Sequence, residues 1–140
     1  MLPIHRRRSL GFALGALLVF SVSPGLAALG AEDPPKLAGT WTWKWKDAQG
    51  ETHRHTLEVE GEGAKMVARE RFDDEKAIKV DKIKLDGKKI TFSVERNDRR
   101  SLYSGTVTNG ETISGKVTVT DQGQPANEYG WTATRQAGGK

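Results

Sequence analysis

Apolar and polar residues alternate along most of the chain between residues 37 and 136. In a β-strand successive side chains point to opposite faces, so this period of two is typical of strands that bury one face. Ile90, Phe92 and Val94 illustrate the pattern, because they share one face of a single predicted strand. No stretch of this region has the apolar spacing of a long amphipathic helix. The pattern therefore predicts an all-β domain.

Turn signals rich in Gly, Asp and Asn divide the region into about eight strands. The strongest signals are Asp86-Gly87 and Asn109-Gly110, which favour tight hairpins. The apolar residues of the fourth strand change face part-way along it, which predicts a β-bulge near Asp81. The predicted strands cover residues 40–46, 52–60, 64–71, 77–85, 89–96, 99–108, 112–120 and 128–135.

The connections between these strands are short, so consecutive strands are expected to be antiparallel neighbours. A sheet of such strands has one apolar face, and the chain is too short to cover that face with a layer of helices. Closure of the sheet buries the apolar face and removes both exposed edges. We therefore predict an antiparallel up-and-down barrel. A two-sheet sandwich is the alternative, and the lack of a long crossover disfavours it.

Two short motifs carry a resemblance to a known group of barrels. The segment LAGTW at residues 37–41 opens the first strand, and WTATR at residues 131–135 closes the last. Together they resemble the calycin pattern of lipocalins, fatty-acid-binding proteins and avidin-like barrels. The resemblance implies that Arg135 packs across the indole of Trp41 as a structural plug, a contact that contributes roughly 0.5 to 2 kcal/mol. The chain also resembles small secreted bacterial domains of unassigned function, a likeness that implies fold and not activity.

The N-terminal region has the features of a secretory signal peptide. Three arginines at residues 6–8 precede an apolar run at 10–22, and small residues follow at 23–31. The run is shorter than the roughly 18 to 20 residues that span a bilayer, so cleavage is expected rather than anchoring. We predict a removed signal peptide at 1–31, a flexible tether at 32–36, a barrel domain at 37–136 and a disordered tail at 137–140. The mature protein is then periplasmic or extracellular.

Charge and cysteine content exclude several classes of function. The net charge of +4 includes three of the 22 Lys and Arg residues in the predicted signal, which leaves 19 against 18 Asp and Glu, or +1. A nucleic-acid partner is therefore not expected. The chain has no cysteine, which excludes disulfides, thiol nucleophiles and thiolate metal sites. No Ser-His-Asp spacing or Gly-rich phosphate loop is evident, so a binding protein is favoured over an enzyme.

Trp41, Trp43 and Trp45 occupy alternate positions and therefore project from one face of the first strand. If this face points inward, Trp43 and Trp45 line the lumen, where they either fill the core or contact a ligand. A slip of one residue would instead expose an aromatic strip. The expected contacts of a small apolar or aromatic ligand are Trp43, Trp45, His53, His55, Met66, Phe92, Tyr103 and Tyr129.

His53 and His55 lie two residues apart on the same face of the second predicted strand. A His-x-His pair on a strand can hold one metal ion, but zinc needs a third protein ligand, for which Glu70 and Tyr129 are candidates. Ordinary lumen histidines are the preferred interpretation, and no other cofactor is expected. Three arginines at residues 96, 99 and 100 cluster near one turn. We interpret them as solvated, although a contact with a carboxylate at the barrel mouth is the alternative.

Three hypotheses about function follow. The first is an exported module that holds a small apolar or aromatic molecule in the lumen of the barrel. The second is a non-catalytic structural or protein-interaction domain of the cell envelope with a filled core. The third is a hydrolase that uses a metal ion bound by His53 and His55.

Overall fold

The computed structural model describes residues 32–122 and 124–138. The predicted signal peptide and the last two residues of the predicted tail lie outside this part of the chain. The described residues form one sheet of nine strands, together with a short 3-10 helix, η1, at Gly63–Lys65. The strands are β1 Gly39–Lys46, β2 Thr52–Glu60, β3 Val67–Phe72, β4 Ile78–Lys79, β5 Asp81–Asp86, β6 Lys89–Arg96, β7 Arg99–Thr108, β8 Thr112–Asp121 and β9 Asn127–Arg135.

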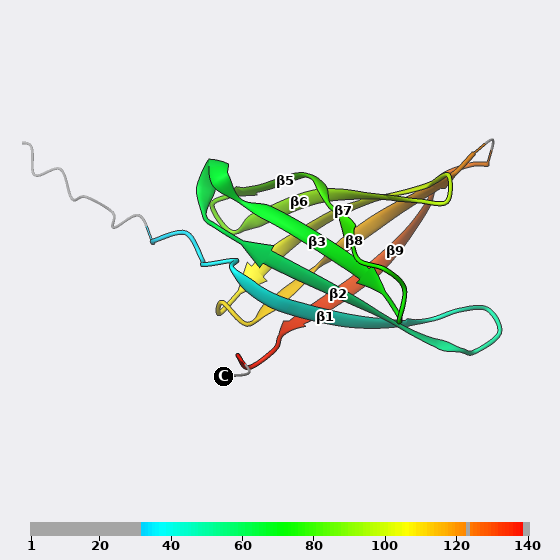
Figure 1. Ribbon diagram of the computed structural model, residues 1–140, viewed down its shortest axis with the longest axis horizontal. Coiled ribbons are helices and arrows are strands. Elements are labelled where there is room, and N and C mark those ends of the chain that lie inside the picture. Colours follow the sequence, from blue (N-terminus) through cyan, green and yellow to red (C-terminus); the bar gives the residue numbers. More distant parts are fainter. Residues whose placement is uncertain (1–31, 123, 139–140) are drawn as a thin grey trace, which may run out of the picture. The chain divides into compact units, whose positions relative to one another are not determined.

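The sheet curls into a nearly closed antiparallel barrel, which confirms the predicted fold class. Its strand order is β4-β3-β2-β1-β9-β8-β7-β6-β5. The first strand pairs with the last, because Trp41 of β1 lies opposite Arg135 of β9. In Figure 1 the ribbon accordingly returns from β9 to the side of β1. This pairing removes the free edges that a meander would otherwise have at its first and last strands.

The expected fourth strand is divided between two neighbours. Its first part, β4, pairs with β3, and its second part, β5, pairs with β6. The register shifts between Asp81 and Lys84, which confirms the predicted irregularity near Asp81. Lys82 has a φ of 52°, and this left-handed conformation turns the backbone away from β3. The division explains why nine strands are observed where about eight were expected.

The third strand begins later than its expected start at residue 64. Residues 63–65 form η1, in which the Met66 N–H donates to the carbonyl of Gly63. Gly61 and Gly63 have φ angles of 77° and 57°, which glycine adopts without steric cost. The alternation of apolar and polar residues in this segment therefore begins before the paired strand β3 does.

The end of the barrel where β1 begins is closed by packed side chains. The Trp41 side chain is 0% exposed, and the Arg135 guanidinium carbon lies 4.3 Å from the centre of its ring. Arg135 also donates hydrogen bonds to the carbonyls of Lys36, Ala38 and Gly110. These bonds join the segment before β1 to the β8 side of the barrel. The expected tether is thus held at residue 36 by a specific contact.

Candidate functional site

The opposite end of the barrel contains an open cavity of about 1020 Å³. It is lined by the later residues of β1, the early residues of β9 and parts of β2, β3, β6, β7 and β8. Because the closed end lies at the start of β1, the same strands seal one end and form the cavity at the other. The inward faces change from apolar residues at the closed end to a mixture of aromatic and charged residues at the mouth.

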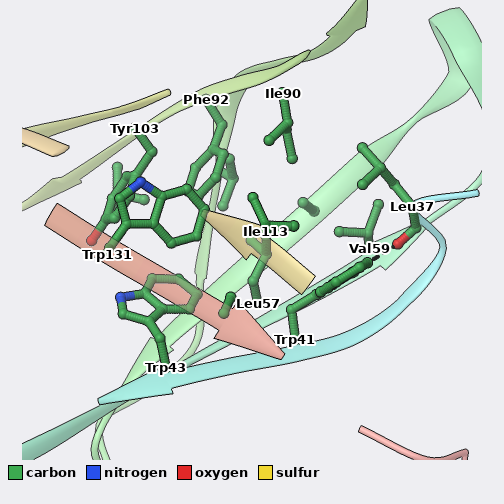
Figure 2. Close-up of a cluster of buried hydrophobic side chains, with 14 of the residues drawn as sticks. Leu37, Trp41, Trp43, Leu57, Val59, Ile90, Phe92, Tyr103, Ile113 and Trp131 are labelled. Atoms are coloured by element: carbon green, nitrogen blue, oxygen red, sulfur yellow. Dashed lines mark hydrogen bonds between the residues drawn. The ribbon is translucent and has the colours of Figure 1, made fainter. Parts of the chain in front are cut away.

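Three aromatic residues, Trp43, Tyr103 and Trp131, form the floor of the cavity. The ring centre of Trp43 lies 5.2 Å from that of Trp131 and 5.5 Å from that of Tyr103. Figure 2 shows these rings converging from three strands, with Phe92 next to Tyr103. Phe92 stacks on Tyr103 at 4.6 Å. Burial, with a smaller contribution from the charge of Glu70, raises the pKa of the Tyr103 hydroxyl, which therefore stays protonated at neutral pH.

The inward-facing Gly105 makes room for the indole of Trp131. Gly105, Gly115 and Trp131 lie opposite one another on β7, β8 and β9. A Cβ atom on Gly105 would lie 3.1 Å from the Trp131 ring and 2.8 Å from a methyl group of Ile113. The indole N–H of Trp131 also donates to the carbonyls of Ser104 and Lys116, at 3.3 and 3.1 Å. This part of the floor is therefore held in one orientation.

A chain of charged and polar groups forms the wall of the cavity where β3 and β6 face each other. Nδ1 of His55 lies 2.6 Å from one oxygen of Glu70, and Arg96 donates to the other oxygen at 2.9 Å. Arg96 also donates to Glu75. An ionised carboxylate only accepts hydrogen bonds, so Nδ1 of His55 is the donor. These contacts connect β3 with β6 near the place where β4 ends and β5 begins. The Glu70 side chain is buried there, with only 1% of its surface exposed.

His55 also stacks on Trp43, with the ring centres 4.8 Å apart and the planes 4° from parallel. The imidazole is therefore held on its face by the floor of the cavity and on its edge by Glu70. The wall and the floor of the cavity thus form one packed unit.

His53 lies at the rim between two aspartates. Nδ1 contacts Asp73 at 2.8 Å and Nε2 contacts Asp47 at 3.2 Å. The hydrogen bonds to Asp73 and Asp47 raise the pKa of His53. With a carboxylate on each ring nitrogen, the arrangement suits the imidazolium form, in which both nitrogens donate. His53 consequently ties the β1–β2 hairpin to the turn after β3.

Five of the eight predicted ligand contacts line the cavity, namely Trp43, Trp45, His55, Tyr103 and Tyr129. The other three lie elsewhere. Phe92 is buried behind Tyr103, Met66 follows η1 toward the closed end, and His53 is occupied by the two aspartates at the rim. Contact of any of the eight with a ligand stays a prediction.

The cavity is also lined by Glu70, Arg96 and Trp131, which are not among the ligand contacts predicted from the sequence. The interpretation of Arg96 as a solvated turn residue was wrong, since its side chain is 19% exposed and bonded to Glu70. Its inward position follows from the alternation of β6, where it continues the row of Phe92 and Val94. This alternation along β6 is the sequence signal that predicts an inward-facing Arg96.

The structure places the two histidines in separate networks, one with Glu70 and one with Asp47 and Asp73. A different group, Asp47, Glu51 and His53, has ligand atoms that all lie within 4.8 Å of one another. Metal binding by His53 and His55 stays a prediction, and metal analysis of the purified protein would test it. Within residues 32–122 and 124–138, no helix is long and apolar enough to span a membrane.

Comparisons with known proteins bear on the fold. No family model matches the chain, and no curated protein matches its sequence. A solved structure of EF1p2_mFAP2b bound to DFHBI is similar, with a TM-score of 0.51 over 71% of this chain and 94% of that one. The fold is a nearly closed antiparallel β-barrel. The sequence identity is 13%, so the likeness of this barrel to that protein concerns architecture alone.

Proposed function

We propose that this β-barrel is a binding protein that holds one small molecule with an apolar or aromatic body in its open cavity. The observation that carries the proposal is the cavity of about 1020 Å³ above a floor of three aromatic side chains. Ligand cavities in proteins typically measure about 300 to 1,000 Å³ and are lined by apolar and aromatic groups. EF1p2_mFAP2b, which has a similar fold, binds DFHBI.

The floor is arranged for binding before a ligand arrives. Trp131 is fixed by two hydrogen bonds and Tyr103 by its stack on Phe92. A rigid aromatic surface loses little conformational entropy when a flat molecule packs on it. We further propose that the protein acts in the periplasm or outside the cell, on the strength of the signal-like N-terminal sequence.

Ligand titrations test the proposal directly. We would titrate the purified protein with palmitate, retinol, haem and DFHBI, follow tryptophan fluorescence, and search for carried ligands by native mass spectrometry. Saturable binding of one molecule per chain is the expected result. If no ligand is carried and neither these four compounds nor the naphthalene compounds described below saturate the protein, the proposal fails and the packed interaction domain becomes the better hypothesis.

A pair of substitutions locates the bound molecule. Val119→Trp adds an indole on a cavity-lining position of β8 and should abolish binding. Thr120→Trp, one residue further and on the exposed face, makes the same addition outside the cavity and should leave binding unchanged. Equal affinities of the two variants would place the ligand elsewhere.

A further inference from the structure

The mouth of the cavity carries exposed aromatic side chains. Four large hydrophobic residues are exposed in the described part of the chain, and two of them, Trp45 at 41% and Tyr129 at 54%, line this cavity. Burial in the barrel core does not account for either ring. Aromatic faces that remain accessible at a cavity entrance are available to a ligand, and the face of such a ring attracts positive charge.

The charged residues that line the cavity are predominantly acidic on its inner side. Counting every lining residue, five carboxylates accompany four cationic side chains. The excess of carboxylates over cationic groups is larger at the inner surface. Lys44 and Lys46 alternate with the inward-facing tryptophans of β1 and therefore lie on its outer face, and Glu128 pairs with Lys116. The inner surface then has four carboxylates, Asp47, Glu70, Glu75 and Asp121, and two guanidinium groups.

Both guanidinium groups are already bound by carboxylates. Arg96 donates to Glu70 and Glu75, and Arg99 forms a two-pronged contact with Asp121 at 2.7 and 3.3 Å. An anionic ligand would have to compete with these carboxylates for either arginine. The carboxylates are likewise paired, so a cation must share them with the arginines. Carboxylates still outnumber guanidinium groups at this surface, and walls of low dielectric constant strengthen the resulting attraction for a cation.

We infer that the ligand of this cavity is an aromatic molecule that carries a positive charge, with its rings on the floor and its cationic group at the mouth. The inference rests on the proposed function, because it names the chemical class that the same cavity binds. The cationic group would lie near the faces of Trp45 and Tyr129 and near the carboxylates of Glu75 and Asp121. The expected preference for the cation over a neutral molecule of the same shape is about tenfold.

Three naphthalene compounds test the inference, because they share one ring system and differ in charge. They are 2-naphthylmethylamine, which is cationic at neutral pH, the neutral 2-naphthalenemethanol and the anionic 2-naphthoate. Isothermal titration of the full purified protein should give the tightest binding for the amine and the weakest for the carboxylate. The preference for the amine should decrease as salt is added, because exposed charges are screened.

Two different failures can be told apart. If the alcohol or the carboxylate binds as tightly as the amine, the charge inference is overturned while the binding function stands. The charge inference is also overturned if palmitate or retinol binds and none of the three naphthalene compounds does. If no compound of either set binds, the proposed function itself fails.

Neutralised variants identify the groups responsible. Glu75→Gln combined with Asp121→Asn removes two negative charges at the mouth and should reduce the amine-to-alcohol affinity ratio at least about threefold. Glu58→Gln removes a negative charge from the exposed face of β2 and should leave the ratio unchanged. Binding of the neutral alcohol serves as the measure of an intact cavity in each variant. An unchanged ratio in the double variant, with alcohol binding preserved, overturns the inference.

Discussion

The substitution Gly115→Ala is expected to destabilise the barrel strongly. A Cβ atom at this position would lie 1.9 Å from the Ser104 carbonyl oxygen and 2.5 Å from the Gly105 Cα atom. Both obstacles are backbone atoms, so β8 would have to move about 1 Å away from β7 and ladder hydrogen bonds would lengthen. Overpacking and weakened hydrogen bonds together should lower the free energy of unfolding by about 3 to 5 kcal/mol. Urea denaturation followed by tryptophan fluorescence measures this loss.

Gly130→Ala is the matched control. Gly130 lies in the neighbouring strand β9, opposite Lys116, and the nearest heavy atom to an added Cβ is 4.0 Å away. Its effect should be within about 0.5 kcal/mol, or slightly stabilising because alanine restricts the unfolded chain. The melting temperature of the Gly115 variant should fall by more than about 10 °C while that of the Gly130 variant stays close to the parent. Equal denaturation midpoints would refute the close packing of β7 on β8.

Three further predictions test other parts of the molecule. Trp41→Ala should lower the free energy of unfolding by about 3 to 5 kcal/mol, because it empties a fully buried site, and a parent-like thermal melt would disprove the plug at the closed end. Arg96→Met should cost about 3 kcal/mol in urea denaturation, because it leaves the buried Glu70 without its cation. Adding Glu70→Leu should recover part of that loss, and no recovery would show that the ion pair is not the cause. The third prediction concerns pH, because two aspartates raise the pKa of His53. The stability that His53 contributes is therefore full below about pH 6.5 and is lost as the pH rises through the raised pKa. The difference in melting temperature between the parent and His53→Gln should accordingly shrink from about pH 5.5 to about pH 9, and a constant difference would contradict this account.

The fold could be predicted from the sequence because its main determinant is local. Alternation of apolar and polar residues fixes which side chains of a strand face inward, and short turns fix the order of neighbouring strands. Even the break between β4 and β5 is visible as a change of parity near Asp81. The start of β3 was placed too early, because the period of two does not distinguish a paired strand from the extended chain beside η1.

The candidate site was less predictable, because it depends on which distant residues meet across the lumen. Parity places Glu70 and Arg96 on inward faces, but it does not show that β3 and β6 approach each other where β4 and β5 diverge. Their ion pair joins residues 26 positions apart. Likewise, Gly105 and Gly115 appear in the sequence as weak points in two strands. Only the packing explains them, because Gly105 leaves space for the indole of Trp131 and Gly115 lets β8 approach the backbone of β7.

The inward faces of the barrel separate stability from binding along one axis. In β2 the inward residues change from Val59 and Leu57 at the closed end to His55 and His53 at the mouth. In β6 they change in the same direction, from Ile90 to Arg96. Since apolar burial is concentrated at the closed end, the mouth can stay hollow and charged without removing much of the packing that holds the fold. The barrel can therefore tolerate changes in the chemistry of its mouth, provided that each buried carboxylate there keeps its cation.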